Sequence, residues 1–252
     1  MKPINYYKTY EDDFIKSKNQ NFKLPDNYVW TKNDICYKIA SKILYVLAYI
    51  FGLLYCKLFL HVKIKNKKIL KKYRKQGYFL YGNHTQEVGD VFIPALVCSP
   101  KRIYTIASPA NLGIPIIGKL LPFIGILPIS EKPLHTKELL KAVKEKIANN
   151  NTIVIYPEAH VWPYYTKIRP YPNTSFKFLQ DLDVPAFCIT TTYQKRRFFN
   201  KPKITTYVDG PFLLDKSTTK KEATQKLCNE IYTCMINRSI NSNYEYIKYK
   251  KE

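Results

Sequence analysis

The sequence predicts an α/β fold, in which a mixed, largely parallel sheet is flanked by helices and follows an N-terminal membrane-associating helical segment. Short apolar runs rich in β-formers alternate with helical patterns from residue 78 onward, which is typical of a parallel sheet. An apolar run and a dense group of cations fill residues 43–75. A chain of 252 residues can bury one core of this kind. We therefore expect a helical segment over residues 1–75 and an α/β domain over residues 76–252.

The apolar run Ile43–Leu60 predicts the helix of the first segment. Lys42 and Lys57 leave fourteen uncharged residues between them, whereas a spanning helix needs about 20. A helix that lies in one leaflet fits this length better than a helix that crosses the bilayer. The alternative is a buried core helix of a soluble domain.

Eight cations follow this helix within thirteen residues. A group this dense beside an apolar helix suits anionic lipid headgroups, at about 1 kcal/mol per residue near the surface. The alternative is an ordinary solvated helix face. The eight are Lys63, Lys65, Lys67, Lys68, Lys71, Lys72, Arg74 and Lys75.

The sheet strands are predicted from six apolar runs bounded by polar or turn residues. They are Tyr78–Tyr81, Ile103–Ala107, Gly125–Ile129, Thr152–Tyr156, Pro185–Thr190 and Ile204–Val208. Helical spacing of apolar residues predicts a helix that ends near Asn149 and, after the capping-box pair Thr219 and Glu222, a second helix. A third helical run follows Asp90.

The amino-acid composition indicates which binding partners and which cellular compartment to expect. Forty-one Lys and Arg against nineteen Asp and Glu give a net charge of +22, which attracts anionic surfaces, acidic carriers, phosphorylated substrates or nucleic acid. No RNP, KH, zinc-finger or helix-turn-helix signature supports a nucleic-acid-binding module, so that module is the weaker alternative.

The six cysteines are scattered without a CxxC pair, which favours reduced thiols over disulfides or zinc. The first residues lack a secretory signal. We expect a peripheral or monotopic protein on the cytoplasmic face of the cell membrane.

Polar residues that could perform catalysis follow two of the predicted strands. His84 and Asp90 come after the first strand, and Glu158 comes just after the fourth. A histidine oriented by a carboxylate can take a proton from a hydroxyl group. No GxSxG motif is present, which favours direct attack by a substrate hydroxyl over a covalent intermediate. The alternatives are a histidine that only caps its loop and a metal held by His84, Glu87 and Asp90.

Four segments of the sequence resemble, in order, the four conserved blocks of the glycerolipid acyltransferases. They are NHTQEVGD (Asn83–Asp90), GIPIIGKLLPFIGILPI (Gly113–Ile129), YPEAH (Tyr156–His160) and DVPAFCIT (Asp183–Thr190). The resemblance covers residues 78–208. It implies an α/β domain beside a membrane-associating helical segment.

The resemblance implies that His84 is the general base and that Asp90 orients it. The family spaces these two residues by four others, whereas this chain has five. We expect Gly89 to absorb the insertion in a turn, with Glu87 as the alternative partner of His84. Glu158, in the third block, is expected to order the acceptor or the loop around it.

Two arginines of the family pattern are missing. Glu131 and Val161 stand in their places, and Ala159 replaces a glycine. Other groups must then hold the acceptor phosphate, or the acceptor must differ. Arg169 is the best substitute because its guanidinium can bind phosphate with two hydrogen bonds. The remaining candidates are Lys119, Lys132, Lys167 and His160.

The resemblance thus implies an acyltransferase that moves a fatty acyl group from acyl-CoA or acyl-carrier protein to the hydroxyl of a lysophospholipid. The expected acceptor is 1-acylglycerol-3-phosphate, which would give phosphatidic acid. The alternative acceptors are another lysolipid or a glycolipid. We expect the donor to be a substrate, with no bound cofactor, no metal and no nucleic-acid partner.

Overall fold

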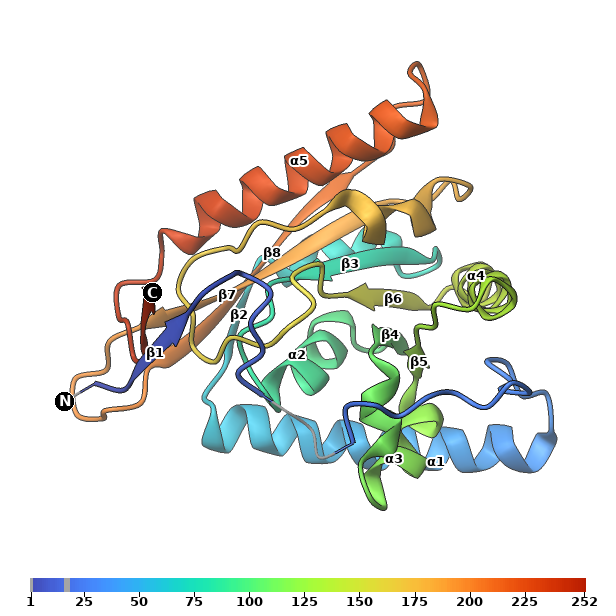
Figure 1. Cartoon of the computed structure of the whole chain (residues 1–252), viewed down its shortest axis with the longest axis horizontal. Coiled ribbons are helices and arrows are strands. Elements are labelled where there is room, and N and C mark those ends of the chain that lie inside the picture. The colour runs from blue at the N-terminus through green and yellow to red at the C-terminus, as the bar shows by residue number, and fades with distance from the viewer. Residues whose placement is uncertain (1, 16–18) are drawn as a thin grey trace.

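A computed structural model describes residues 2–15 and 19–252, and its centre is a seven-stranded sheet (Figure 1). The strand order is β2-β8-β7-β3-β6-β4-β5. Strands β7, β3, β6, β4 and β5 are parallel, β8 is antiparallel to β7, and β2 is parallel to β8. The strand bounds are β2 Lys63–Lys65, β3 Tyr78–Gly82, β4 Ile103–Ala107, β5 Ile126–Pro128, β6 Thr152–Ile155, β7 Ala186–Gln194 and β8 Lys203–Phe212. The predicted fold, a mixed and largely parallel α/β sheet, is confirmed.

Helices cover both faces of the sheet. Figure 1 shows α5 on one side, and α2 with α1 beneath it on the other. Side chains of the central strand β3 alternate between two cores: Phe79 and Tyr81 face the core of α4 and α5, whereas Tyr78 and Leu80 face that of α1 and α2. The helix bounds are α1 Ile35–Leu54, α2 Gly89–Cys98, α3 Ile117–Leu120, α4 Pro133–Ala148 and α5 Lys220–Ser239. The short 3₁₀ helices are η2 Lys67–Tyr73, η3 Pro109–Gly113, η4 Leu121–Ile124 and η5 Asn173–Leu179.

All six predicted strands are present, and the local signals for the helices are confirmed. Thr219 and Glu222 form the capping box of α5, and α4 is capped by Asn149. Strands β7 and β8 run further than predicted, to Gln194 and Phe212. The extension of β7 carries the buried residues Thr191, Thr192 and Tyr193, whereas that of β8 consists of the partly or fully exposed residues 209–212, so apolar runs alone underestimate these strands.

Two parts of the fold differ from the sequence prediction. Residues 1–33, which show no periodicity, include strand β1 Ile4–Tyr7, which pairs in parallel with β9 Lys248–Lys251 in a separate two-stranded sheet. The polybasic stretch is not one helix face, because its first residues form β2 beside β8 and the later ones form η2. The first predicted segment therefore contributes a strand to the main sheet. The boundary at residue 75 stays a prediction.

The N-terminal helix α1 packs along one side only. It continues as a π-helical turn η1 (Tyr55–Phe59), so that the two form one helix of 25 residues, Ile35–Phe59. An 18-residue window of this helix has a mean hydropathy of 1.8, and 17% of that window is buried. By length and composition this helix could cross a membrane. Gly52 faces α2 so closely that a Cβ there would lie 2.4 Å from the Phe92 ring. The opposite face is exposed and apolar, which excludes the alternative of a buried core helix. Its residues are Ile35, Ile39, Ile43, Val46, Leu47, Ile50, Phe51, Leu54, Leu58 and Phe59.

Candidate active site

The candidate site lies where two adjacent parallel strands end. Strands β3 and β6 pair in register, with Tyr81 opposite Ile155, so the residues that follow them emerge at the same edge of the sheet. His84 and Glu158 are therefore brought together from positions 74 residues apart. Ligands of parallel α/β sheets bind at this edge.

His84 and Asp90 form the pair that the sequence predicts. Nδ1 of His84 lies 2.8 Å from Oδ2 of Asp90, and the same oxygen accepts backbone N–H groups of Thr85 and Gln86 at 2.9 Å each. As a carboxylate, Asp90 can only accept, so Nδ1 donates and Nε2 keeps its lone pair. Asp90 is buried, whereas the His84 side chain is 19% exposed. The arrangement can hold one imidazole tautomer and stabilise its protonated form.

The extra residue between His84 and Asp90 is accommodated by a turn at Glu87 and Val88. Helix α2 begins at Gly89, and N–H of Asp90 donates to the carbonyl oxygen of Gln86 at 3.0 Å. Gly89 has helical backbone angles, so the expectation that its flexibility absorbs the insertion is wrong. Its role is close packing, because a Cβ there would lie 2.9 Å from Cβ of Gln86. Glu87 is exposed, and Asp90 is the carboxylate that His84 contacts.

Tyr156 contacts both members of the pair and was not predicted. Its ring stacks on the His84 imidazole with a centroid separation of 4.4 Å and an angle of 15°, and its hydroxyl donates to the Asp90 carbonyl oxygen at 2.6 Å. Burial, with a further contribution from the charge of Asp90, raises the pKa of Tyr156 well above its ordinary value. It therefore stays a neutral donor. Gly82 opposite leaves room for the ring, since a Cβ there would lie 2.7 Å from it. In the sequence, a glycine at the end of a strand indicates that a bulky side chain of a neighbouring segment can pack against it.

Glu158 holds the His84 backbone from the side of β6. Its Oε2 accepts the His84 N–H at 2.9 Å and Nη2 of Arg169 at 3.1 Å, and its Oε1 accepts the Arg169 N–H at 2.9 Å. The side chains of Arg169 and Glu158 are 1% and 0% exposed. The Arg169 guanidinium also donates to carbonyl oxygens of Tyr10, at 3.2 Å, and His160, and lies 4.8 Å from the Trp162 ring. The structure thus encloses Arg169 behind the strand end, where it fixes the loop.

Lys132, His160 and Lys167 are among the other residues predicted to bind the acceptor phosphate. Lys132 pairs with Asp26 at the start of α4, His160 is half-exposed with Nδ1 3.6 Å from Asp13, and Lys167 is exposed. Within residues 2–15 and 19–252, no hydrogen bond or ion pair joins these three to His84. Their predicted phosphate-binding roles stay predictions.

Strand β7 braces the His84 loop from the opposite side. The Tyr193 hydroxyl lies 2.7 Å from Oγ1 of Thr85 and accepts from Nε2 of Gln86 at 3.0 Å. The Asn83 side chain forms two hydrogen bonds, of 3.0 and 2.8 Å, with the backbone of Thr191. The loop that carries His84 is therefore held from both neighbouring strands.

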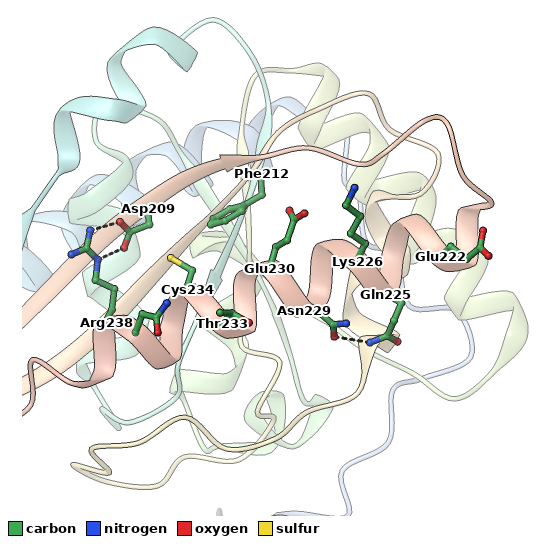
Figure 2. Close-up of a pocket in the computed structure, with 11 residues that line it drawn as sticks. Asp209, Phe212, Glu222, Gln225, Lys226, Asn229, Glu230, Thr233, Cys234 and Arg238 are labelled. Carbon is green, nitrogen blue, oxygen red and sulfur yellow. Dashed lines mark hydrogen bonds and ion pairs between the residues drawn. The ribbon is translucent and has the colours of Figure 1, made fainter.

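A separate groove of about 950 Å³ lies between β8 and α5, and His84 is not among its lining residues (Figure 2). Near it, ligand atoms of Cys188, Asp209 and Cys234 lie within 4.8 Å of one another, as a metal site requires. However, Arg238 binds both oxygens of Asp209, at 2.8 and 2.6 Å. The positive charge of Arg238 would therefore repel a metal ion bound at Asp209. Among the described residues, His84, Glu87 and Asp90 do not form a comparable cluster.

Comparisons with known proteins identify the family. The family model described as "Acyltransferase" matches residues 61–191, just over half of the chain. The chain therefore belongs to the acyltransferase family, and the predicted resemblance is confirmed. The fold is similar to the crystal structure of the 1-acyl-sn-glycerophosphate (LPA) acyltransferase PlsC from Thermotoga maritima, with a TM-score of 0.59, 13% identity, and coverage of 85% of this chain and 86% of that chain. A comparison with curated protein sequences finds no significant match.

Removing one partner of the Glu158–Arg169 pair is expected to destabilise the fold strongly. Glu158→Gln or Arg169→Met each leaves a buried charge without its partner, so each should lower the free energy of unfolding by about 3–5 kcal/mol. The double variant should lose much less than the sum of the two. Urea unfolding of the four proteins checks this, and simple additivity of the two single effects would contradict the coupling.

Proposed function

We propose that this acyltransferase moves a fatty acyl group from a thioester donor, acyl-CoA or acyl-carrier protein, to the hydroxyl of a lysophospholipid. The first candidate acceptor is 1-acylglycerol-3-phosphate, with phosphatidic acid as the product. The observation that carries the proposal is the His84–Asp90 pair at the edge of the sheet, which leaves Nε2 available to a hydroxyl. Family membership supports acyl transfer. A glycolipid or another lysolipid is the alternative acceptor.

In the proposed reaction, Nε2 of His84 takes the proton of the acceptor hydroxyl. The oxygen attacks the thioester carbonyl carbon, and a C–O bond forms. Collapse of the tetrahedral intermediate breaks the C–S bond, and the imidazolium returns its proton to the leaving thiolate. Asp90 stabilises the imidazolium through the Nδ1 hydrogen bond. The products are an ester and a free thiol, so no cofactor or oxidant is consumed.

We assign Glu158 and Arg169 to ordering the loop around the acceptor. Glu158 fixes the backbone at His84, and the enclosed guanidinium of Arg169 fixes Glu158. The phosphate of the acceptor would then be bound by cations that solvent can reach. Lys119, Lys132 and Lys167 are exposed and His160 is half-exposed, so these four are the candidates.

The exposed apolar face of α1 supports docking on one leaflet of a membrane. The helix is packed against α2 and η4 on one side, so it can contact lipid only along its other side. That geometry fits a helix lying in the interface better than one that crosses it. With a net charge of +22, the cytoplasmic face, where anionic lipids are concentrated, is the proposed location.

Thioester consumption with a panel of lysolipid acceptors tests the function. We expect release of free thiol only when a lysolipid is present, with the highest kcat/KM for 1-acylglycerol-3-phosphate. The panel should include lysophosphatidylglycerol, lysophosphatidylcholine and a lysoglycolipid, each with acyl-CoA and with acyl-carrier protein. Thiol release that is independent of every acceptor would contradict acyl transfer to a lysolipid.

His84→Ala and Asp90→Asn are expected to reduce turnover in the same assay. Loss of the base should lower kcat by about a hundredfold or more, the usual contribution of a general base. The amide introduced by Asp90→Asn could donate rather than accept toward Nδ1, which favours the wrong tautomer. Glu87→Gln is the matched control, because this carboxylate lies in the same loop but is exposed. Equal losses in Glu87→Gln and Asp90→Asn would contradict the assigned role of Asp90.

Charged substitutions on α1 are expected to weaken membrane docking. Leu47 and Ile50 are half exposed on the apolar face, so Leu47→Glu and Ile50→Glu should leave the fold intact. Each removes an apolar group worth about 1.5 kcal/mol or more on burial, so binding to phosphatidylglycerol-containing vesicles should fall at least tenfold in a co-sedimentation assay. Leu213→Glu, exposed at the far end of β8, is the control. Unchanged binding in both α1 variants would exclude this face.

A further inference from the structure

The loop between β7 and β8, residues 195–202, exposes two aromatic rings among cations. Phe198 is 81% and Phe199 is 66% exposed, although large aromatic side chains are usually covered. Four cations lie within three residues of them: Lys195, Arg196, Arg197 and Lys201. We refer to residues 195–202 as the hairpin loop.

The hairpin loop is held in place at its base. Nη2 of Arg196 donates to the carbonyl oxygen of Leu60 at 3.3 Å, and N–H of Lys195 donates to Oδ1 of Asn243 at 3.0 Å. The Tyr244 hydroxyl donates to the Asn200 carbonyl oxygen at 3.2 Å. Its exposed rings are therefore presented by an anchored loop.

One of these contacts, from Arg196 to Leu60, links the hairpin loop to the end of the apolar face of α1. Leu60, which Arg196 contacts, follows directly after η1, whose Leu58 and Phe59 are exposed. Figure 1 shows the end of α1 and the β7–β8 connection on the same side of the molecule. The hairpin loop and the exposed end of this helix are thus linked by a hydrogen bond.

The hairpin loop also lies at the edge of the sheet that carries His84. Strand β7 is parallel to β3, so both strands end at that edge. Tyr193, two residues before the loop, contacts Thr85 and Gln86, which follow His84 in the chain. A partner that binds the hairpin loop would therefore lie close to the candidate active site.

The chemistry of the loop favours an anionic bilayer as that partner. The guanidinium of Arg197 lies 5.2 Å from the Phe198 ring, and that of Arg196 lies 5.7 Å from the Phe199 ring. Apolar rings with adjacent cations fit the boundary between acyl chains and headgroups, where the rings enter the chains and the cations stay at phosphate. Each cation near such a surface strengthens binding about fivefold. An acidic protein would satisfy the cations but would not explain the link to the end of the apolar face of α1.

We propose that the hairpin loop is a second membrane anchor, which inserts Phe198 and Phe199 among anionic lipids and sets the His84 edge against the bilayer. With α1 it makes two contacts with the membrane, which fix the orientation of the molecule as one contact cannot. This orientation would deliver a membrane-borne acceptor to His84, and that part of the proposal rests on the proposed function.

A tryptophan reporter tests the insertion directly. Phe198→Trp should show a blue-shifted emission with phosphatidylcholine/phosphatidylglycerol vesicles and quenching by chain-brominated phosphatidylcholine. Leu213→Trp, exposed at the other end of β8, is the matched control and should show neither change. The native Trp30 and Trp162 are buried and contribute the same background in both variants. Phe199→Trp provides a second reporter from the same loop.

A second test measures vesicle affinity in variants that lack either the two aromatic rings or one cation. Phe198→Ser with Phe199→Ser should lower vesicle affinity roughly tenfold or more, and Arg197→Gln about fivefold. Both variants should retain wild-type turnover on a short-chain lysolipid dispersed below its critical micelle concentration, whereas their turnover on acceptor embedded in vesicles should fall in proportion to the loss of vesicle affinity.

The outcomes separate this proposal from the proposed function. Vesicle-bound protein in which both tryptophan reporters stay unquenched overturns the hairpin anchor, whatever the turnover. Absence of vesicle binding by the wild-type protein overturns it as well. Quenched reporters in a protein that turns over no lysolipid acceptor support the anchor while contradicting the proposed function.

Discussion

A buried carboxylate must be satisfied by hydrogen bonds, and the geometry at the end of the central strands depends on how Glu158 meets this requirement. It accepts the backbone N–H groups of His84 and Arg169 as well as the Arg169 guanidinium. Because the cost of an unpaired charge in the interior is several kcal/mol, the two strand ends and the loop between them have one favourable arrangement. Glu158 acts on His84 through its backbone and makes no hydrogen bond to the imidazole.

The imidazole is positioned by a second carboxylate with a different task. Asp90 gathers three N–H groups on one oxygen, so that His84 Nδ1 and the following turn are held together. Tyr156 covers one face of the ring, and Tyr193 braces the turn from β7. Side chains from β7 and from the residue after β6 therefore support the loop that leaves β3, and among the described residues no hydrogen bond is made to Nε2 of His84. Such prior positioning reduces the reorganisation that a proton transfer would need.

Much of the sheet could be predicted because its signals are local, whereas the pairing of His84 with Asp90 was predicted from the family resemblance. The apolar runs of β3 and β6 are bounded by polar residues, and His84 and Glu158 follow them directly. The partners of these residues could not be predicted in this way. Tyr156 stacks on His84 only because Gly82 lies opposite in the paired strand, which depends on register. The burial of Arg169 depends on Tyr10 and Trp162 closing over it, so a single cation among 41 carries no such signal.

The pairing of β1 with β9 has a consequence for how the protein matures. Tyr7 and Tyr249 both pack against Trp162, whose indole N–H donates to the Asp12 carbonyl oxygen, and Trp162 lies under the Arg169 guanidinium. The core on one face of the sheet includes Leu227, Ile231 and Met235 of α5, so the sheet is completed only once α5 has been synthesised. The aromatic cover over the Glu158 loop, by contrast, must wait for residues 248–251. The cover over the Glu158 loop is therefore the last part of this region to be completed.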